Sequence, residues 1–260
     1  MEQFLAIFKY FPEFDAGLTA GLLIFARFLA FAKFAPVIGR SEINVTIRLG
    51  FALVMTIIFI GIVDPGPMPQ DFPFIIGLLV NTIMGAFLGF VASAIFSAIA
   101  AGGDMINMQM GLSSAMMFDQ STRTQGSLLS AFFNLLAAVI YINIGGIYWL
   151  IRAMEKSFEL CGVFITSFDM TLIASQDYLI SITANVLYIG LQIASPVLLA
   201  SLGQDIILGI ISRTAPQVNV FQLSFLFKPG LGALILIFVL PMLLNIINDN
   251  FIAHQSILNI

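Results

Sequence analysis

The sequence is short of the side chains on which much enzyme and metal chemistry depends. Its 260 residues include one cysteine, Cys161, and one histidine, His254. An intrachain disulfide is excluded, and a zinc site, which usually takes three or four Cys or His ligands, is not expected. A Ser–His or Cys–His catalytic pair would depend on His254, which lies in a polar tail. We therefore expect neither an enzyme nor a bound cofactor or metal.

Charged side chains are also scarce. Only 9% of the residues are charged, whereas 60% are hydrophobic, and soluble domains carry about 25% charged residues. The formal net charge is −4, without a basic stripe, so nucleic acid is not an expected partner. So few charges cannot cover a soluble surface, and most of the chain is expected to face lipid or apolar protein. This composition predicts an integral membrane protein.

Six apolar stretches are long enough, or nearly so, to cross a hydrocarbon core that needs about 20 residues. They are Gly17–Phe34, Leu49–Val63, Phe72–Gly103, Thr124–Ile151, Tyr178–Gln204 and Pro229–Asn248. Backbone polar groups in lipid must pair internally, so helices are expected. Phe72–Gly103 would extend about 48 Å as a straight helix, against a core of about 30 Å. We predict an all-α protein of about six long hydrophobic helices, some broken or hairpin-like.

Small residues recur at every fourth position within the third stretch, at Gly85, Gly89, Ser93 and Ser97. Such spacing lets another backbone approach closely, either within the chain or from another subunit. Both alternatives are open from the sequence. Arg27 lies in the middle of the first stretch and needs an acceptor there, because a charge is costly in lipid. We group it with these positions as a candidate for subunit packing.

Five of the twelve methionines fall between Asp104 and Phe118; they are Met105, Met108, Met110, Met116 and Met117. Methionine is unbranched and repacks easily. A segment rich in it can seal a pore and yield again, or it can simply fill gaps in a core. The sequence leaves both interpretations open.

One run of residues resembles a family signature. Ser212–Phe221 reads SRTAPQVNVF, which is similar to the Arg-x-x-Pro-Gln-x-Asn-x-Phe pattern of the FliR family. The following Lys228-Pro229-Gly230, the earlier Arg27 with Ala35-Pro36, and Arg48 match in order, as does the stretch from Ala101 to Gly111. One departure is Gly103-Asp104, where many relatives have Gly-Glu, and this change keeps the charge.

The resemblance implies a subunit of the core export gate of the bacterial flagellar type III secretion system. Such a subunit works with FliP and FliQ to form and gate the channel for unfolded flagellar proteins. One FliR-like copy is expected in a helical ring of five FliP-like and four FliQ-like subunits, with FlhB and FlhA as further partners. Residues 1–176 would be FliP-like and residues 177–260 a FliQ-like helical hairpin. The expected location is the bacterial inner (cell) membrane at the flagellar basal body, as a multi-pass protein.

The resemblance also implies functional residues. Residues 104–125 would include a pore plug, with Met110, Gly111, Leu112, Met116, Met117 and Phe118 as its candidates and Asp119–Gln125 as a polar rim. Arg213, Pro216, Gln217, Asn219, Phe221 and Lys228 would form a cytoplasmic motif in the 212–229 link, where an FlhB-like loop could bind.

Two rival functions are less well supported by the residues. A small multi-helix secondary transporter should show ionisable side chains converging at mid-membrane and two matching halves, and neither is evident. An intramembrane enzyme would need a catalytic cluster that the sequence does not display.

Overall fold

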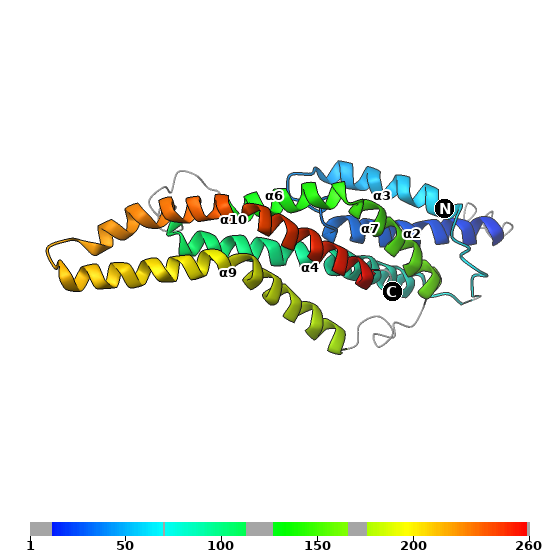
Figure 1. Ribbon diagram of the computed structural model, residues 1–260. Helices are drawn as coiled ribbons and strands as arrows, with labels where there is room; N and C mark the ends of the chain where they lie inside the picture. The colour runs from blue at the N-terminus through cyan, green and yellow to red at the C-terminus, as the bar shows by residue number, and fades with distance from the viewer. Residues whose placement is uncertain (1–11, 70, 113–126, 166–175, 259–260) are drawn as a thin grey trace. The chain divides into compact units, whose positions relative to one another are not determined.

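A computed structural model describes residues 12–69, 71–112, 127–165 and 176–258. Within these residues the chain forms seven α-helices and no strand (Figure 1). They are α2 (Pro12–Phe34), α3 (Val45–Ile60), α4 (Phe74–Gln109), α6 (Leu128–Asn143), α7 (Gly146–Leu160), α9 (Gln176–Thr214) and α10 (Val220–Leu258). Four of them are long and apolar enough to cross a membrane, or five spans if α6 and α7 count as one. The all-α membrane architecture is confirmed.

The three longest helices exceed the thickness of a bilayer. α4 has 36 residues, and α9 and α10 have 39 each, which corresponds to about 54–58 Å at about 1.5 Å per residue. The hydrocarbon core is about 30 Å thick. The excess length expected at Phe72–Gly103 is therefore present, and α4 accommodates it without a break.

The fourth apolar stretch departs from the expected single helix. It divides into α6 and α7, whose axes differ by 73°. Gly145 stands between them with φ +80°, a left-handed conformation that favours glycine and redirects the chain. α7 then continues to Leu160 and buries one face, including Leu150 and Met154. Its other face exposes Arg152, Glu155 and Glu159, so α7 has a polar side that lipid would not accommodate.

α10 begins at Val220, nine residues before the apolar stretch that predicted it. The stretches were bounded by charges, and Lys228 therefore placed the start of this one too late. Lys228 lies inside the helix because its Nζ pairs with an Asp205 carboxylate oxygen on α9 at 2.7 Å. Within a helix, a paired charge does not mark a boundary.

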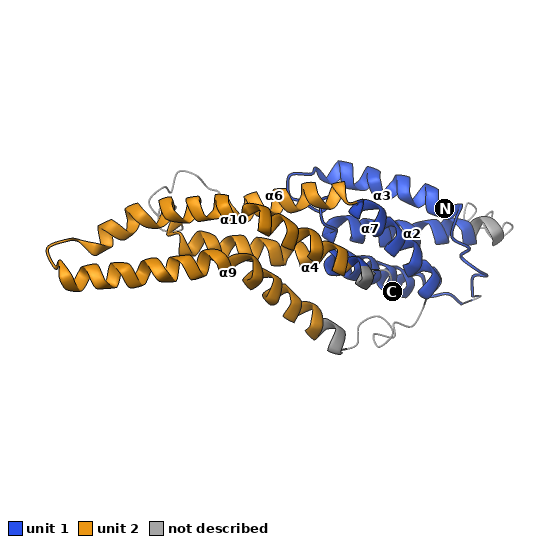
Figure 2. Cartoon of the chain, in the orientation of Figure 1, with its two compact units in different colours: residues 1–93, 145–179, 255–260 blue, residues 94–144, 180–254 orange. Residues whose placement is uncertain are grey.

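Unit 1 comprises residues 1–93, 145–179 and 255–260 (Figure 2). It holds α2, α3, the first part of α4 and α7. α2 and α3 pack against each other, and three rings from α2, α3 and α7 form its aromatic centre. The ring centroids of Phe28 and Phe59 are 4.8 Å apart, and Phe158 lies 6.0 Å and 5.9 Å from them.

Unit 2 comprises residues 94–144 and 180–254 (Figure 2). It holds the rest of α4, α6, and most of α9 and α10. Phe96, Tyr141 and Phe251 bring α4, α6 and α10 together, with ring centroids 5.1–5.3 Å apart. α4 and α9 approach closely at Gly102, where an added Cβ would lie 3.0 Å from the carbonyl oxygen of Gly190. The two backbones can come this close because neither glycine carries a side chain.

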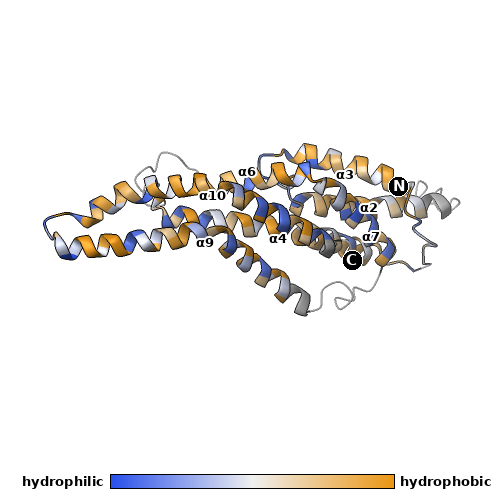
Figure 3. Ribbon diagram, viewed as in Figure 1, coloured by the Kyte–Doolittle hydropathy of each residue, from blue (hydrophilic) through white to orange (hydrophobic). Residues whose placement is uncertain are grey.

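Much of the apolar surface of α9 and α10 is not covered within the chain (Figure 3). Leu199 is 70% exposed, Ile237 71% and Phe238 76%. Of the most apolar window in Val220–Gln255, only 17% is buried. Contiguous apolar faces of this kind require lipid or other subunits around them.

Candidate functional site

Arg27 is the centre of a buried hydrogen-bond network in unit 1. Its side chain is fully buried in the middle of α2. Nε and one terminal nitrogen donate to the Oδ1 atom of Asn81 at 2.9 and 2.7 Å. The other terminal nitrogen donates to the carbonyl oxygen of Ser157 at 3.0 Å, and the carbonyls of Cys161 and Gly162 also accept, at 3.0 and 3.1 Å. The acceptor predicted for Arg27 is therefore present, and it comes from α4 and from the end of α7.

Asn81 is oriented so that its oxygen faces the guanidinium. Its amide nitrogen donates to the carbonyl oxygens of Gly77 and Val163, at 2.8 and 3.0 Å. The Phe158 ring covers the guanidinium, with its centroid 4.0 Å from Cζ of Arg27, a favourable cation–π contact. The network links α2, α4 and α7 through polar groups that have been removed from water.

The small residues of α4 serve packing within the chain at two of their positions. A Cβ at Gly85 would overlap the backbone oxygen of Arg27, and a Cβ at Gly89 would lie 2.9 Å from the oxygen of Phe31. Gly85, Gly89 and Arg27 are all buried inside unit 1. α2 of the same chain fills the space beside Gly85 and Gly89, and Arg27 has its acceptors within unit 1. These contacts fit the alternative of packing within the chain, and a role of the three residues in subunit packing stays a prediction. Ser93 is partly exposed and Ser97 exposed, and a subunit contact there stays a prediction.

The end of α4 carries the described part of the candidate plug. Gly111 has φ +72°, and its N–H donates to the carbonyl oxygen of Met108 at 3.1 Å, so it ends the helix in the left-handed conformation typical of a C-terminal glycine. Met110 is only 3% exposed, whereas Met108 is 70% exposed. Leu112 is partly exposed. Met116, Met117, Phe118 and the polar rim 119–125 lie outside the described residues.

Met110 is buried against a glycine that the sequence analysis did not identify. An added Cβ at Gly232 of α10 would lie 2.5, 2.9 and 3.1 Å from Cγ, Cε and Sδ of Met110. Beside this contact, a hollow of about 220 Å³ separates the end of α4 from α10. Its lining comprises Met108, Gln109, Met110, Gly111, Ser224, Phe225, Lys228 and Pro229. The plug candidate Met110 and the motif residue Lys228 thus border the same space.

The signature run forms a tight turn between α9 and α10. α9 ends at Thr214 and α10 begins at Val220, so the link expected over 212–229 is only residues 215–219. Arg213 is exposed in the last turn of α9, and Phe221 and Lys228 belong to α10. The loop is therefore shorter than predicted, because the backbone is already helical from Val220 onward.

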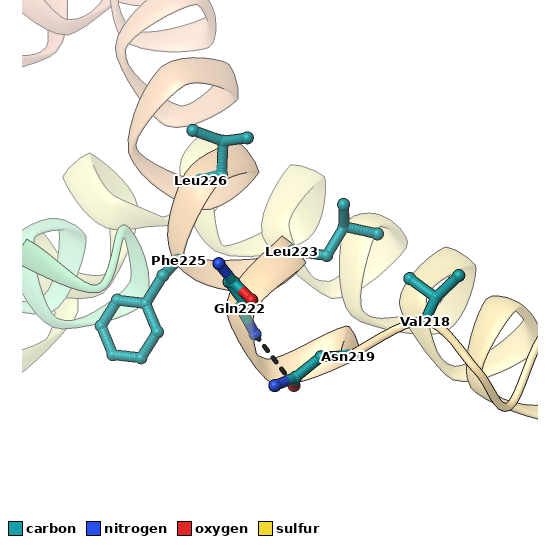
Figure 4. A pocket seen from close by; sticks show the side chains of 6 residues that line it. All are labelled: Val218, Asn219, Gln222, Leu223, Phe225 and Leu226. Atoms are coloured by element: carbon teal, nitrogen blue, oxygen red, sulfur yellow. Dashed lines mark hydrogen bonds between the residues drawn. The ribbon is translucent and has the colours of Figure 1, made fainter.

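Asn219 in this turn and Phe221 in the first turn of α10 have distinct surroundings. The Oδ1 atom of Asn219 accepts a hydrogen bond from the backbone N–H of Gln222 at 3.3 Å (Figure 4), as an N-cap side chain does. Phe221 is 73% exposed, and its ring contacts that of Phe225 at 4.9 Å between centroids. Pro216 and Gln217 form the turn itself.

An open, largely apolar groove of about 500 Å³ runs along the first turns of α10 (Figure 4). Its lining comprises Val218, Asn219, Gln222, Leu223, Phe225 and Leu226. A groove of this kind suits an apolar segment of another protein. Among the described residues, no group of three or more His, Cys, Asp or Glu side chains is placed to hold a metal ion.

Comparisons with known proteins extend over most of the chain. The sequence model of the family described as "Bacterial export proteins, family 1" matches residues 18–253. The flagellar biosynthetic protein FliR of Bacillus subtilis (strain 168) is 26% identical over 250 residues, covering 95% of this chain and 93% of that protein. FliR of Aquifex aeolicus (strain VF5) is 27% identical over 236 residues, or 88% of each chain. The surface presentation of antigens protein SpaR of Shigella flexneri is 29% identical over 227 residues, covering 83% of this chain and 82% of that protein.

Proposed function

Because the chain belongs to family 1 of the bacterial export proteins, we propose that it is the FliR-type subunit of the core export gate of a flagellar type III secretion system. The observation that carries the proposal is the family match over residues 18–253. Relatives named FliR match over similar lengths. In this role the chain is a multi-pass protein of the bacterial inner membrane at the flagellar basal body. It helps to form and gate the channel for unfolded flagellar proteins.

The proposed partners are FliP and FliQ subunits, with one copy of this chain in each gate, and FlhB and FlhA beside it. The exposed apolar faces of α9 and α10 support an assembly, because their length exceeds what lipid alone would cover. In the proposed arrangement residues 1–176 take the place of a FliP-like subunit. The helices of residues 177–260 take the place of a FliQ-like hairpin. A hairpin needs a short connection between its two helices, and the link of residues 215–219 joins the end of α9 to the start of α10 with only five residues.

The proposed gate is the segment of residues 104–125. Its described part, residues 104–112, comprises the last turns of α4 and the three residues that follow the helix, and Met110 and Gly111 among them border a hollow. Soft apolar side chains at Met116, Met117 and Phe118 would seal the closed channel and yield to a passing chain. Replacing these three residues by glycine should make cells leak ions while the assembly still forms. Ion permeability equal to that of the wild type would reject the plug.

The proposed partner contact is the turn of residues 215–219 with the groove beside it, facing the cytoplasm. An FlhB-like loop would lie along the groove, where Val218, Phe225 and Leu226 supply an apolar surface. A cysteine at Gln217 should then form crosslinks to an FlhB partner that carries cysteines in its loop. A cysteine at Tyr148, 65% exposed on α7, is the matched control.

Two measurements test the overall function. Deletion of the gene should abolish motility and the export of hook protein, and the intact chain should restore both. The detergent-solubilised assembly should have a mass that fits one copy of this chain with five FliP-like and four FliQ-like subunits. Loss of injectisome secretion with motility retained would point instead to a system like that of the SpaR relative. Solute transport by the purified chain alone in liposomes would favour the secondary transporter.

A further inference from the structure

Positive charge gathers at one end of α3, in the link that joins it to α2. From the last turn of α2 to the first turn of α3 the chain holds Lys33, Arg40 and Arg48, against one acidic residue, Glu42. The link at the other end of α3, residues 61–73, holds two aspartates and no lysine or arginine. The two ends of α3 therefore differ in the sign of their charge.

Backbone contacts bring the three cations to one place in unit 1. Gly39 packs on the end of α2, where an added Cβ would lie 2.5 Å from the carbonyl oxygen of Lys33. A terminal nitrogen of Arg48 donates to the carbonyl oxygens of Arg40 and Ile43, at 2.6 and 2.9 Å. The link is thus folded back on α2 and tied to α3, so the backbone that carries these cations has a defined position.

The charged ends of Lys33 and Arg40 are accessible. Lys33 is exposed, and its Nζ lies 5.7 Å from the centroid of the Phe34 ring. The Nε atom of Arg40 lies 3.5 Å from a Glu42 carboxylate oxygen, and 25% and 70% of the two side chains are exposed. An ion pair open to solvent contributes about 0–1 kcal/mol, so Arg40 can exchange Glu42 for another anion.

An apolar face continues from this basic end along α3 and is not covered within the chain. Several of its side chains are between 48% and 64% exposed: Leu53, Val54, Ile57 and Ile58. From Leu49 to Ile60 the helix rises about 17 Å at about 1.5 Å per residue. One leaflet of a hydrocarbon core about 30 Å thick measures about 15 Å. The face therefore has the length of one layer of acyl chains, with the cations at one end of it.

We propose that this end of α3 binds an anionic phospholipid, with the phosphate beside Lys33, Arg40 and Arg48 and an acyl chain along the apolar face of α3. Such a lipid combines in one molecule the anion and the apolar chain that the surface suits. A helix of another subunit would match the surface only with an acidic side chain at one end of an equally long apolar stripe. The inference goes beyond the proposed function, because it depends on the chain lying in a membrane and not on a role in export.

The test counts the lipids retained by the complete chain, purified from its membrane with the subunits that accompany it. The sample is incubated with equal amounts of phosphatidylglycerol, which is anionic, and phosphatidylcholine, which has no net charge. It is then washed with detergent, and the bound lipids are measured by mass spectrometry. The test variant is Lys33→Gln with Arg40→Gln. Arg48 is left in place, because its side chain holds the link together.

Two further variants serve as controls. Arg152→Gln with Lys156→Gln also removes one arginine and one lysine from unit 1, but from α7. Lys33→Arg with Arg40→Lys keeps both charges in the link. We expect the wild type and both controls to retain several-fold more phosphatidylglycerol than phosphatidylcholine, and the test variant to lose this preference. Equal retention of phosphatidylglycerol by the test variant and the α7 control would overturn the inference.

A second measurement on the wild-type protein decides the matter even if the test variant does not fold. Phosphatidylglycerol with a photoactivatable group on its acyl chain should label peptides of α3 between Leu49 and Ile60 several-fold more than phosphatidylcholine with the same group. Equal labelling by the two lipids would refute selection by charge. Absence of label on α3, with α3 crosslinked to another subunit instead, would show that protein rather than lipid covers this face.

Discussion

Replacing Arg27 measures how far unit 1 depends on one buried guanidinium. Arg27→Met keeps a long side chain but removes every donor. The Oδ1 atom of Asn81 and the carbonyl oxygen of Cys161 lose the hydrogen bonds that Arg27 donates to them. The Ser157 carbonyl is less affected, because the backbone N–H of Cys161 also donates to it. The Gly162 carbonyl also loses a donor, but Gly162 is exposed, so water can replace that hydrogen bond.

The expected magnitude follows from these two acceptors. A buried acceptor left without a donor costs about 1–3 kcal/mol, so two of them cost about 2–6 kcal/mol. Removal of the guanidinium also removes the cost of keeping a charge away from water, which acts in the opposite direction. We expect a net loss of roughly 3 kcal/mol in the free energy of unfolding. For a chain of this size, that lowers Tm by roughly 6–12 °C.

The assay is the temperature at which the detergent-solubilised assembly loses its monodisperse peak. Arg27→Lys is the first control: a single ammonium cannot reach all the acceptors that the guanidinium reaches, so an intermediate loss is expected. Asn81→Leu breaks the same pair from the other side, so the double variant should lose less than the sum of the two single losses. A Tm within about 1 °C of the wild type for Arg27→Met, or strictly additive losses, would refute the reasoning.

Three further predictions concern other contacts. Gly85→Val should sharply reduce folded protein, because the side chain overlaps the backbone of α2, whereas Gly50→Ala, which has nothing within 4 Å, should be tolerated; in-gel fluorescence of tagged chains measures both. Asn219→Ala should cost about 1 kcal/mol through loss of the N-cap, and Asn219→Ser should restore most of it in a thermal melt of the assembly. Lys228→Met should lower the stability of the assembly by no more than about 1 kcal/mol in the same thermal melt, because its ion pair with Asp205 is partly exposed. A larger loss for Lys228→Met, with no loss for Asp205→Asn, would show that Lys228 has another partner.

The helices could be predicted where the sequence has long apolar runs, because a chain in lipid must pair its backbone polar groups internally. Long apolar runs indicated α4 and α9, and the need for an acceptor at Arg27 is met by Asn81 and three carbonyls. The bend at Gly145 was not predicted, because a glycine in an apolar run does not reveal whether its φ is positive. The start of α10 was placed too late, because the pairing of Lys228 with Asp205 is a tertiary contact.

The candidate site was predicted less well than the helices. The motif from Arg213 to Phe221 stands out in the sequence, but its division into a short turn and the first turn of α10 depends on backbone geometry. Gly232 carries no local signal that separates it from Gly230. Only the contact of Gly232 with Met110, at the end of α4, distinguishes the two positions, and this tertiary contact cannot be read from the local sequence.

The most direct test of the account is whether cargo passes the end of α4. A photo-crosslinking amino acid placed at Leu112 should form adducts with a flagellar protein stalled in the export apparatus, while the same group at Phe238, 76% exposed on α10, should crosslink to subunits or lipid only. Adducts with cargo from Leu112 and none from Phe238 are the predicted result. Cargo adducts absent at Leu112, in assemblies that carry the stalled protein, would contradict the claim that this segment lines the export path.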